Sequence, residues 1–276
     1  MSPRKRFNPL PGLGLTLGFT LFYLSVVVLI PIAVLCLKVF ALSWTDLWKG
    51  ISSERALAAY ELSLGASLAA SVANAVFGSL LAWVLVRYRF PGRRLIDGLV
   101  DFPFALPTSV AGLTLASLFA GDGWLGRYLV PHGINGAYSR LGVVLALTFV
   151  GLPFAVRTLQ PVLESFDRGV EEAAASLGAG RLTTFMRVIL PTLLPTILTG
   201  LALSFARALG EYGSIVFISG NLPKRTEIAP TLIFQRMESH DIAGAVGVAV
   251  VLLIFSFFLL AAINWLERWS SRFQRA

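Results

Sequence analysis

The stretch EEAAASLGA, residues 171–179, lies in a charged loop between long apolar segments of the chain. Asp167 can cap a helix that begins just after it, and the two glutamates suit the positive end of such a helix. Gly178 allows the chain to leave this helix and turn. A second amphipathic piece can follow over 181–190 and end before Pro191. The stretch therefore predicts two short helices separated by a break.

The segments around this loop are apolar over lengths that match a lipid bilayer. A membrane span needs about 20 mostly apolar residues. Six segments qualify, at roughly 17–40, 62–86, 98–120, 141–161, 195–218 and 242–266. Of the 276 residues, 56% are hydrophobic and only 14% are charged, whereas a soluble domain carries about 25% charged residues. The sequence therefore predicts an all-α integral membrane protein with about six transmembrane helices.

The N-terminal segment has one feature of a secretory signal, because Arg4, Lys5 and Arg6 precede an apolar run. No residue from Phe7 to Leu37 is charged, however, and that run is far longer than a signal-peptide core of about 7–15 residues. We expect the segment to be retained as the first membrane helix.

The basic residues are distributed unevenly between the predicted loops. With the N-terminus placed in the cytoplasm, the inside segments hold roughly twice as many Lys and Arg residues as the outside loops. The inside residues are Arg4, Lys5, Arg6, Arg87, Arg89, Arg93, Arg94, Arg157, Arg168, Arg181, Arg187, Arg268, Arg272 and Arg275. The outside residues are Lys49, Arg55, Arg127, Arg140, Lys224, Arg225 and Arg236. This bias predicts that both termini are cytoplasmic, and it explains most of the net charge of +8 without a nucleic-acid partner.

The sequence shows no soluble domain. We expect a cytoplasmic N-terminal segment over 1–16, a single transmembrane domain over 17–266 and a cytoplasmic tail over 267–276. The loop at about 164–191 is long for this otherwise compact layout, and a loop of that length usually has a function.

This loop resembles the EAA loop of bacterial binding-protein-dependent ABC importer permeases. The likeness rests on EAA at 172–174, LGA at 177–179 and LP at 190–191, and on the position of the loop before the last two spans. The resemblance implies a type I ABC importer permease fold in a bacterial-type inner membrane, with a short helix that docks into a cleft on a separate ATPase subunit. The implied coupling residues are Glu171, Glu172, Ala173, Ala174, Leu177, Gly178, Ala179 and Pro191. The alternative is an amphipathic helix that lies on the bilayer surface.

Three further segments resemble the sulfate and molybdate permeases. The run DFPFALPTSVAG at 101–112 is similar to their third span, and FARALGEYGS at 205–214 is similar to their fifth. The run ISGN at 218–221, with TE at 226–227 and IF at 233–234, is most similar to the T subunits of sulfate/thiosulfate permeases.

The resemblance implies a larger machine. It would contain a homologous W-type permease chain, two ATPase subunits and a periplasmic binding protein, and it would carry sulfate and thiosulfate. ATP with Mg would be used by the partner ATPase, while this chain would bind no cofactor itself. A molybdate or tungstate importer is the alternative within the same family. An ion-gradient secondary transporter is disfavoured because the inverted repeats that are common in such proteins are not evident.

Polar residues in the predicted fifth span are candidates for a translocation route. Ser204, Arg207, Glu211 and Ser214 occur at helical spacing and so share one helix face. Charges inside a membrane usually face a partner or water. A planar guanidinium donates two hydrogen bonds at once, which suits a tetrahedral oxyanion. The alternative is that Arg207 and Glu211 neutralise each other and fix helix packing.

Proline residues interrupt the predicted third span. Pro103 and Pro107 break the ladder of backbone hydrogen bonds, and the freed carbonyl groups must be satisfied by neighbours or by cavity water. Thr108 and Ser109 are therefore further route candidates, and a simple packing kink is the alternative. Small polar residues at helical spacing between 63 and 78 are interpreted as a packing or dimer-contact stripe of the second span.

The motifs of an enzyme are absent from the sequence. There is no Walker A motif and no Gly-Lys pair, so this chain cannot cradle nucleotide phosphates in that way. His132 and His240 are the only histidines and lie in predicted outside loops, which predicts no metal site. We expect a transport subunit that is not itself an enzyme.

Overall fold

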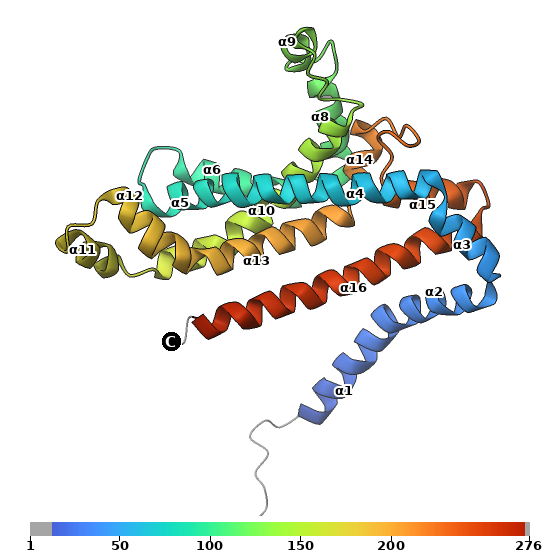
Figure 1. Ribbon diagram of the computed structural model, residues 1–276, viewed down its shortest axis with the longest axis horizontal. Helices are drawn as coiled ribbons and strands as arrows, with labels where there is room; N and C mark the ends of the chain where they lie inside the picture. Colours follow the sequence, from blue (N-terminus) through green and yellow to red (C-terminus); the bar gives the residue numbers. More distant parts are fainter. Residues whose placement is uncertain (1–12, 274–276) are drawn as a thin grey trace, which may run out of the picture.

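The computed structural model describes residues 13–273, and every regular element in this range is helical. Four long helices lie side by side and form the bundle of Figure 1. They are α4 (Glu54–Ala73), α10 (Arg140–Ser165), α13 (Leu190–Leu209) and α16 (Ile242–Phe273). Helix α4 continues through η2 (Asn74–Gly78) into α5 (Ser79–Arg87). The all-α prediction is confirmed, while residues 1–12 and 274–276 of the predicted terminal segments lie outside the described residues.

Among the described residues, five helices are long and apolar enough to cross a membrane. They are Leu13–Ala41, Glu54–Arg87, Arg140–Ser165, Arg181–Leu209 and Ile242–Ile263. These helices correspond to the first, second, fourth, fifth and sixth predicted spans.

The predicted third span, 98–120, is not a single helix. The chain instead forms α6 (Arg93–Val100), α7 (Phe102–Ala105) and α8 (Thr108–Phe119). Pro107 favours the extended conformation of the preceding residue, so a helix cannot run through this point without distortion. The 12 residues of α8 cover about 18 Å, which is short of the roughly 30 Å hydrocarbon core of a bilayer. A series of short helices therefore replaces the third predicted span.

The predicted fifth span, 195–218, differs at both ends. One helix runs from α12 (Arg181–Thr184) through η4 (Phe185–Ile189) into α13, and α14 (Gly213–Ile218) is separate. The predicted helix end before Pro191 is therefore wrong. The π-helical turn η4 ends at Ile189, just before this proline. Such a turn shifts the pattern of backbone hydrogen bonds, and Pro191 has no N–H to donate to that pattern.

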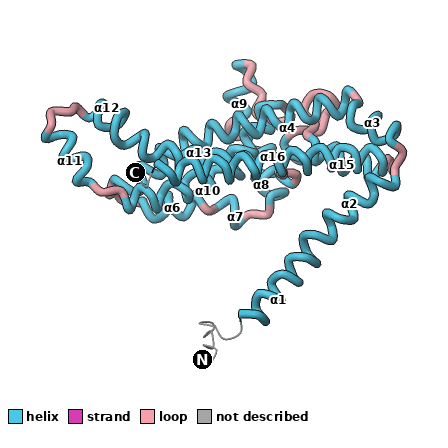
Figure 2. Tube along the Cα trace, turned by 60° about the horizontal axis from the view of Figure 1, so that its bottom comes forward, coloured by secondary structure: helices cyan, strands magenta, loops and turns pink. Residues whose placement is uncertain are grey.

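The first membrane helix contacts the bundle where α2 (Ile30–Ala41) meets α16, and its N-terminal part diverges from it. It consists of α1 (Leu13–Leu24), η1 (Ser25–Leu29) and α2, and α1 diverges from the other helices in both views (Figures 1 and 2). None of its residues is buried. Its apolar surface must therefore be covered by lipid or by another membrane protein.

Small residues bring the central helices close together. Ser63, Ser67, Ser71 and Asn74 are all at most 3% exposed. They lie on α4 and η2, which pack against α10 and α13, and Ser63 accepts a hydrogen bond of 2.8 Å from the N–H of Ala229 in α15 (Ala229–Glu238). A Cβ atom placed on Gly78 would lie only 2.9 Å from Cβ of Ala155. Side chains of this size permit close helix approach in a membrane. The packing interpretation of the stripe between 63 and 78 is thus supported by its place in the bundle.

The end of the bundle away from the EAA loop carries α3 (Trp44–Ser52) and α15 (Ala229–Glu238). The buried guanidinium of Arg236 joins these elements, since it donates to the carbonyl oxygens of Gly50 at 2.9 Å and Gly244 at 2.8 Å. Two short elements, α9 (Gly126–Leu129) and η3 (Val130–His132), follow α8 and project from the bundle in Figure 1.

Candidate functional site

The EAA loop forms α11 (Arg168–Ser176) and then the start of the helix that continues into α13, at one end of the bundle (Figure 1). Helix α11 is capped by Asp167, whose carboxylate accepts a hydrogen bond from the N–H of Gly169 at 2.8 Å. The chain leaves this helix at Gly178, where φ is +79°. The following residue, Ala179, donates its N–H to the carbonyl of Ala174 at 3.0 Å. This left-handed cap favours glycine, because a Cβ would strain it.

The outer surface of α11 is open to its surroundings. Glu172 and Ala173 are exposed, and the side chain of Leu177 at the end of the helix is 89% exposed. Leu182, at the start of the next helix, is 70% exposed. Exposed leucines beside an alanine-rich helix are typical of a protein interaction surface.

Glu171 has a different role from its neighbour Glu172. Its carboxylate forms an ion pair of 2.6 Å with Arg87 at the end of α5. The guanidinium of Arg87 also lies 5.1 Å from the ring of Trp83 and 5.6 Å from the ring of Phe166. Glu171 therefore attaches α11 to the bundle, while its side chain remains 30% exposed. Pro191, another predicted coupling residue, lies in α13 and not in α11.

The polar centre of the bundle is formed by the break between α13 and α14. Glu211 is 2% exposed, and one of its oxygens accepts from Arg207 at 2.6 Å. The other oxygen accepts from both the backbone N–H and the hydroxyl of Ser214, each at 3.0 Å. The carboxylate thus caps the start of α14, and Glu211 and Ser214 are not on a continuation of α13. The side chain of Arg207 remains 33% exposed.

Helix α8 crosses α14 closely enough to join this centre. A Cβ on Gly112 would lie 2.2 Å from the carbonyl oxygen of Ser214, so any side chain there would collide with backbone. A Cβ on Gly213 would lie 2.1 Å from the hydroxyl oxygen of Thr108 and 3.3 Å from that of Ser109. The structure therefore places the hydroxyl groups of Thr108 and Ser109, two predicted route residues, next to the part of the polar centre that contains Ser214.

Ser204 is separate from the other route candidates. It is fully buried, and its hydroxyl accepts a hydrogen bond of 2.9 Å from the side-chain amide of Asn74. A Cβ on Gly151 would lie 2.4 Å from that hydroxyl, so three helices meet at this point. Ser204 thus contributes to packing between helices in this structure, whereas Arg207 is partly exposed.

A second arginine, Arg157 of α10, forms a network of ion pairs with two carboxylates. Arg157 is paired with Asp97 and Asp101, with both ion-pair distances at 2.6 Å. The hydrogen bonds from Arg157 and Gln160 lower the pKa of Asp97, so the pair stays charged at neutral pH. Asp101 therefore neutralises an arginine of the fourth span. The signal in the sequence was an arginine and a carboxylate at the ends of two adjacent predicted spans.

Glu227, in the TE pair at 226–227 that resembles the sulfate permeases, has a structural role. Glu227 is 1% exposed and binds Arg55 through two hydrogen bonds of 2.6 and 2.7 Å. The pair ties the loop before α15 to the first turn of α4. The partners are 172 residues apart, so no local pattern could have shown the pairing.

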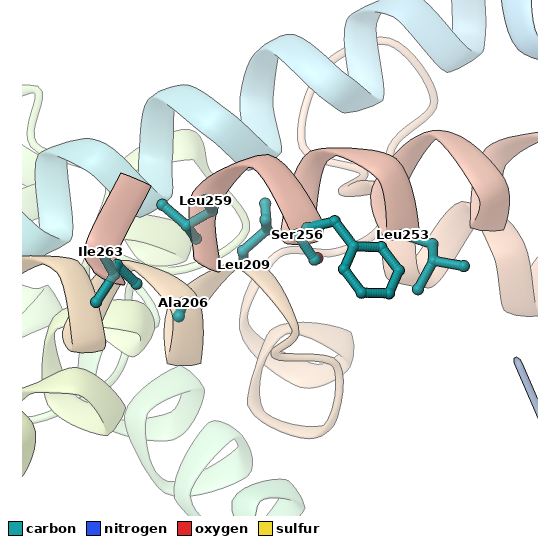
Figure 3. Close-up of a pocket in the computed structure, with 7 residues that line it drawn as sticks. Ala206, Leu209, Leu253, Ser256, Leu259 and Ile263 are labelled. Atoms are coloured by element: carbon teal, nitrogen blue, oxygen red, sulfur yellow. The ribbon is translucent and has the colours of Figure 1, made fainter. Parts of the chain in front are cut away.

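An apolar cavity of about 270 Å³ lies between α13 and α16 (Figure 3). Ala206, Leu209, Leu253 and Leu259 are among its lining residues, and it offers the single hydroxyl of Ser256, which already donates to the carbonyl of Leu252. An oxyanion needs several donors, so this cavity does not suit one. Within residues 13–273, no group of His, Cys, Asp and Glu side chains could hold a metal ion.

Comparison with known sequences places this arrangement in a family. The family model described as "Binding-protein-dependent transport system inner membrane component" matches residues 74–272. The sulfate transport system permease protein CysT of Synechococcus elongatus is 50% identical over 98% of both chains. The protein of the same name from Escherichia coli is 46% identical over 96% of this chain and 95% of its own. A probable sulfate transport system permease protein of Nephroselmis olivacea is 51% identical over 93% of this chain and 90% of its own.

Solved structures show the same fold at low sequence identity. A bacterial ABC transporter involved in the import of alginate matches with a TM-score of 0.74, at 16% identity over 94% of this chain and 95% of the other. The methionine ABC transporter MetNI matches with a TM-score of 0.58, at 17% identity over 83% of this chain and 99% of the other. The fold is that of a type I ABC importer permease. The chain belongs to the family of binding-protein-dependent transport system inner membrane components, as a multi-pass transport subunit of the inner membrane and not an enzyme.

Proposed function

We propose that this chain is the T-type permease subunit of an ATP-driven importer that carries sulfate, and also thiosulfate, across the inner membrane. The observation that carries the proposal is near-full-length similarity, at 46–50% identity, to permeases named for sulfate transport in separate bacteria. The other subunits would be a homologous W-type permease chain, two ATPase subunits that use ATP with Mg, and a periplasmic binding protein.

The exposed surface of α11 is the proposed contact with the ATPase. Ala173 permits close approach, while Leu177 presents a large apolar side chain at the helix end. Gly178 fixes the direction in which the chain leaves the helix. Because Arg87 holds Glu171, a movement imposed on α11 would reach the second membrane helix directly.

The polar centre around Arg207 is the proposed route for the anion. Its guanidinium uses one nitrogen on Glu211 and keeps about a third of the side-chain surface open, which leaves donors for a tetrahedral oxyanion. The buried carboxylate of Glu211 holds the arginine in place and offsets its charge. The site therefore attracts the anion without binding it too tightly to release it, and transport needs both properties.

The test is uptake of labelled sulfate into vesicles that contain the reconstituted complex. Uptake should need ATP and should be lost in Glu172→Ala, whose side chain lies on the exposed surface of α11. Glu164→Ala is the matched control, since Glu164 is also exposed but lies in α10. Unlabelled molybdate serves as the competitor.

Each result discriminates between the functions considered. ATP-dependent sulfate uptake that the competitor does not abolish would support the proposal. Uptake of molybdate alone would keep the importer and overturn the choice of sulfate. Uptake without ATP would overturn the ATP-driven mechanism.

A further inference from the structure

The turn between α5 and α6 carries an unusual concentration of positive charge. Its sequence is RYRFPGRR, residues 87–94, with four arginines in eight positions. Figure 1 places this turn at the same end of the bundle as the EAA loop. According to the predicted orientation, this end faces the cytoplasm.

Three of these arginines surround a cavity of about 330 Å³. The residues that line it are Arg89, Phe90, Gly92, Arg93 and Arg94, and none of them is acidic. Among the side chains that the structure describes, no ion pair holds Arg89, Arg93 or Arg94, although the charge of Arg93 helps to lower the pKa of Asp97. Arg87 and Arg157, nearby in the fold, are by contrast both paired with carboxylates. The cavity therefore carries more positive charge than Asp97, which is also paired with Arg157, can offset.

The backbone adds to this charge. Gly92 has φ of +83° and directly precedes α6, so the N-terminal end of this helix lies at the cavity. The N–H groups of Arg93, Leu95 and Ile96 already donate to the carbonyls of Phe90 and Gly92. The N-terminus of a helix carries a partial positive charge, which favours an anion. The arginine side chains match the oxygens of a phosphodiester, because a planar guanidinium donates two hydrogen bonds at once.

The surface next to the cavity indicates the source of such an anion. Leu95 and Leu99 lie one turn apart on α6 and are 68% and 54% exposed, and Tyr88 is 57% exposed. A short helix with arginines at its start and exposed leucines along its length is typical of a segment in the bilayer interface. A free anion or an acidic soluble protein would leave these leucines in water, whereas a phospholipid would cover them with its acyl chains.

We propose that the turn 87–94 and α6 bind an anionic phospholipid of the leaflet on the EAA-loop side. The phosphodiester would lie among Arg89, Arg93 and Arg94, and the acyl chains would lie along Leu95 and Leu99. This site is independent of the proposed substrate, and its occupant is recognised by charge at the depth of the lipid headgroups.

The first measurement is native mass spectrometry of the full complex, released from membranes in mild detergent with phosphatidylglycerol or phosphatidylcholine added. The test variant is Arg89→Gln with Arg94→Gln, because both side chains are exposed and unpaired. The control variant is Arg127→Gln with Arg225→Gln, which removes two exposed arginines elsewhere on the chain. Retention of phosphatidylglycerol should fall by about 25-fold in the test variant, at about fivefold for each arginine, and stay unchanged in the control.

A second comparison separates charge from folding. Arg89→Lys with Arg94→Lys keeps the charge and should retain most of the phosphatidylglycerol, while phosphatidylcholine should bind weakly to every variant. Equal retention of phosphatidylglycerol by wild type and Gln variant would overturn the proposal. Displacement of the lipid by millimolar inorganic phosphate would instead indicate a free-anion site, and loss of the ATPase subunit without loss of lipid would indicate a protein contact. Sulfate uptake is not the readout, so this test can fail or succeed independently of the proposed function.

Discussion

At the scale of single residues, burial separates the roles of groups that look alike in the sequence. Ser204 and Arg207 share a helix, yet the serine is fully buried on Asn74 while the arginine is partly exposed. Glu171 and Glu172 are adjacent, but only the first is held by Arg87. The spacing of these residues was visible in the sequence. The partners of Ser204 and Glu171 were not, because Asn74 and Arg87 lie on other helices. The pairing of Arg207 with Glu211 could be read from their spacing of four residues.

Replacing Arg207 by glutamine tests the route. Sulfate uptake should fall to background, since the only charge that attracts the anion in the polar centre is removed. Glutamine keeps one donor for Glu211, so the amount of assembled complex should stay near the wild-type level. The measurement is vesicle uptake, compared with complex yield by size-exclusion chromatography. Normal uptake in assembled Arg207→Gln would show that the arginine acts only in packing.

At the scale of elements, helix boundaries were the least predictable feature. Hydropathy located the membrane segments, because a run of apolar residues is read directly from the sequence. It did not show that α13 ends at Leu209 and that Glu211 caps a separate helix, since that break depends on a carboxylate that bonds to Ser214. The third segment was similarly marked by Pro103 and Pro107, but the division into α6, α7 and α8 needed the structure.

A glycine comparison tests the cap of the coupling helix. Gly178 has φ of +79°, so Gly178→Ala should strain the end of α11 by about 1 kcal/mol and tilt the exposed surface around Leu177. Gly180 lies two residues away in the extended region, with no atom near its Cβ position, so Gly180→Ala should have little effect. We expect reduced ATP-driven uptake and weaker ATPase retention only in the first variant. Equal activity of the two variants would show that the cap geometry is not needed for coupling.

At the scale of the whole molecule, the helix bundle has two ends that differ in their elements, and small residues pack the helices between them. One end carries the EAA loop and the arginine-rich turn, and the other carries α3, α15 and the Arg236 hydrogen bonds (Figure 2). The polar centre lies between them. This arrangement suits a subunit that transmits a movement from one side of the membrane to a route inside it. The ion pair of Arg87 with Glu171 is one link in that path, across 84 residues of sequence, and the continuous helix Arg181–Leu209 is another.

A charge exchange tests whether this link transmits movement or only stabilises the fold. Arg87→Gln should lower the sulfate carried per ATP hydrolysed, because α11 could then move without pulling on α5. It should also lower the thermal midpoint by a few degrees, since Glu171 would lose its partner. In Arg87→Glu with Glu171→Arg the pair is restored with reversed charges. Recovery of the ratio of sulfate to ATP in this double variant, measured in the same vesicles, would assign the pair to coupling. A recovered midpoint with a ratio that stays low would assign it to stability alone, with the stacking of Arg87 on Trp83 and Phe166 then carrying the coupling.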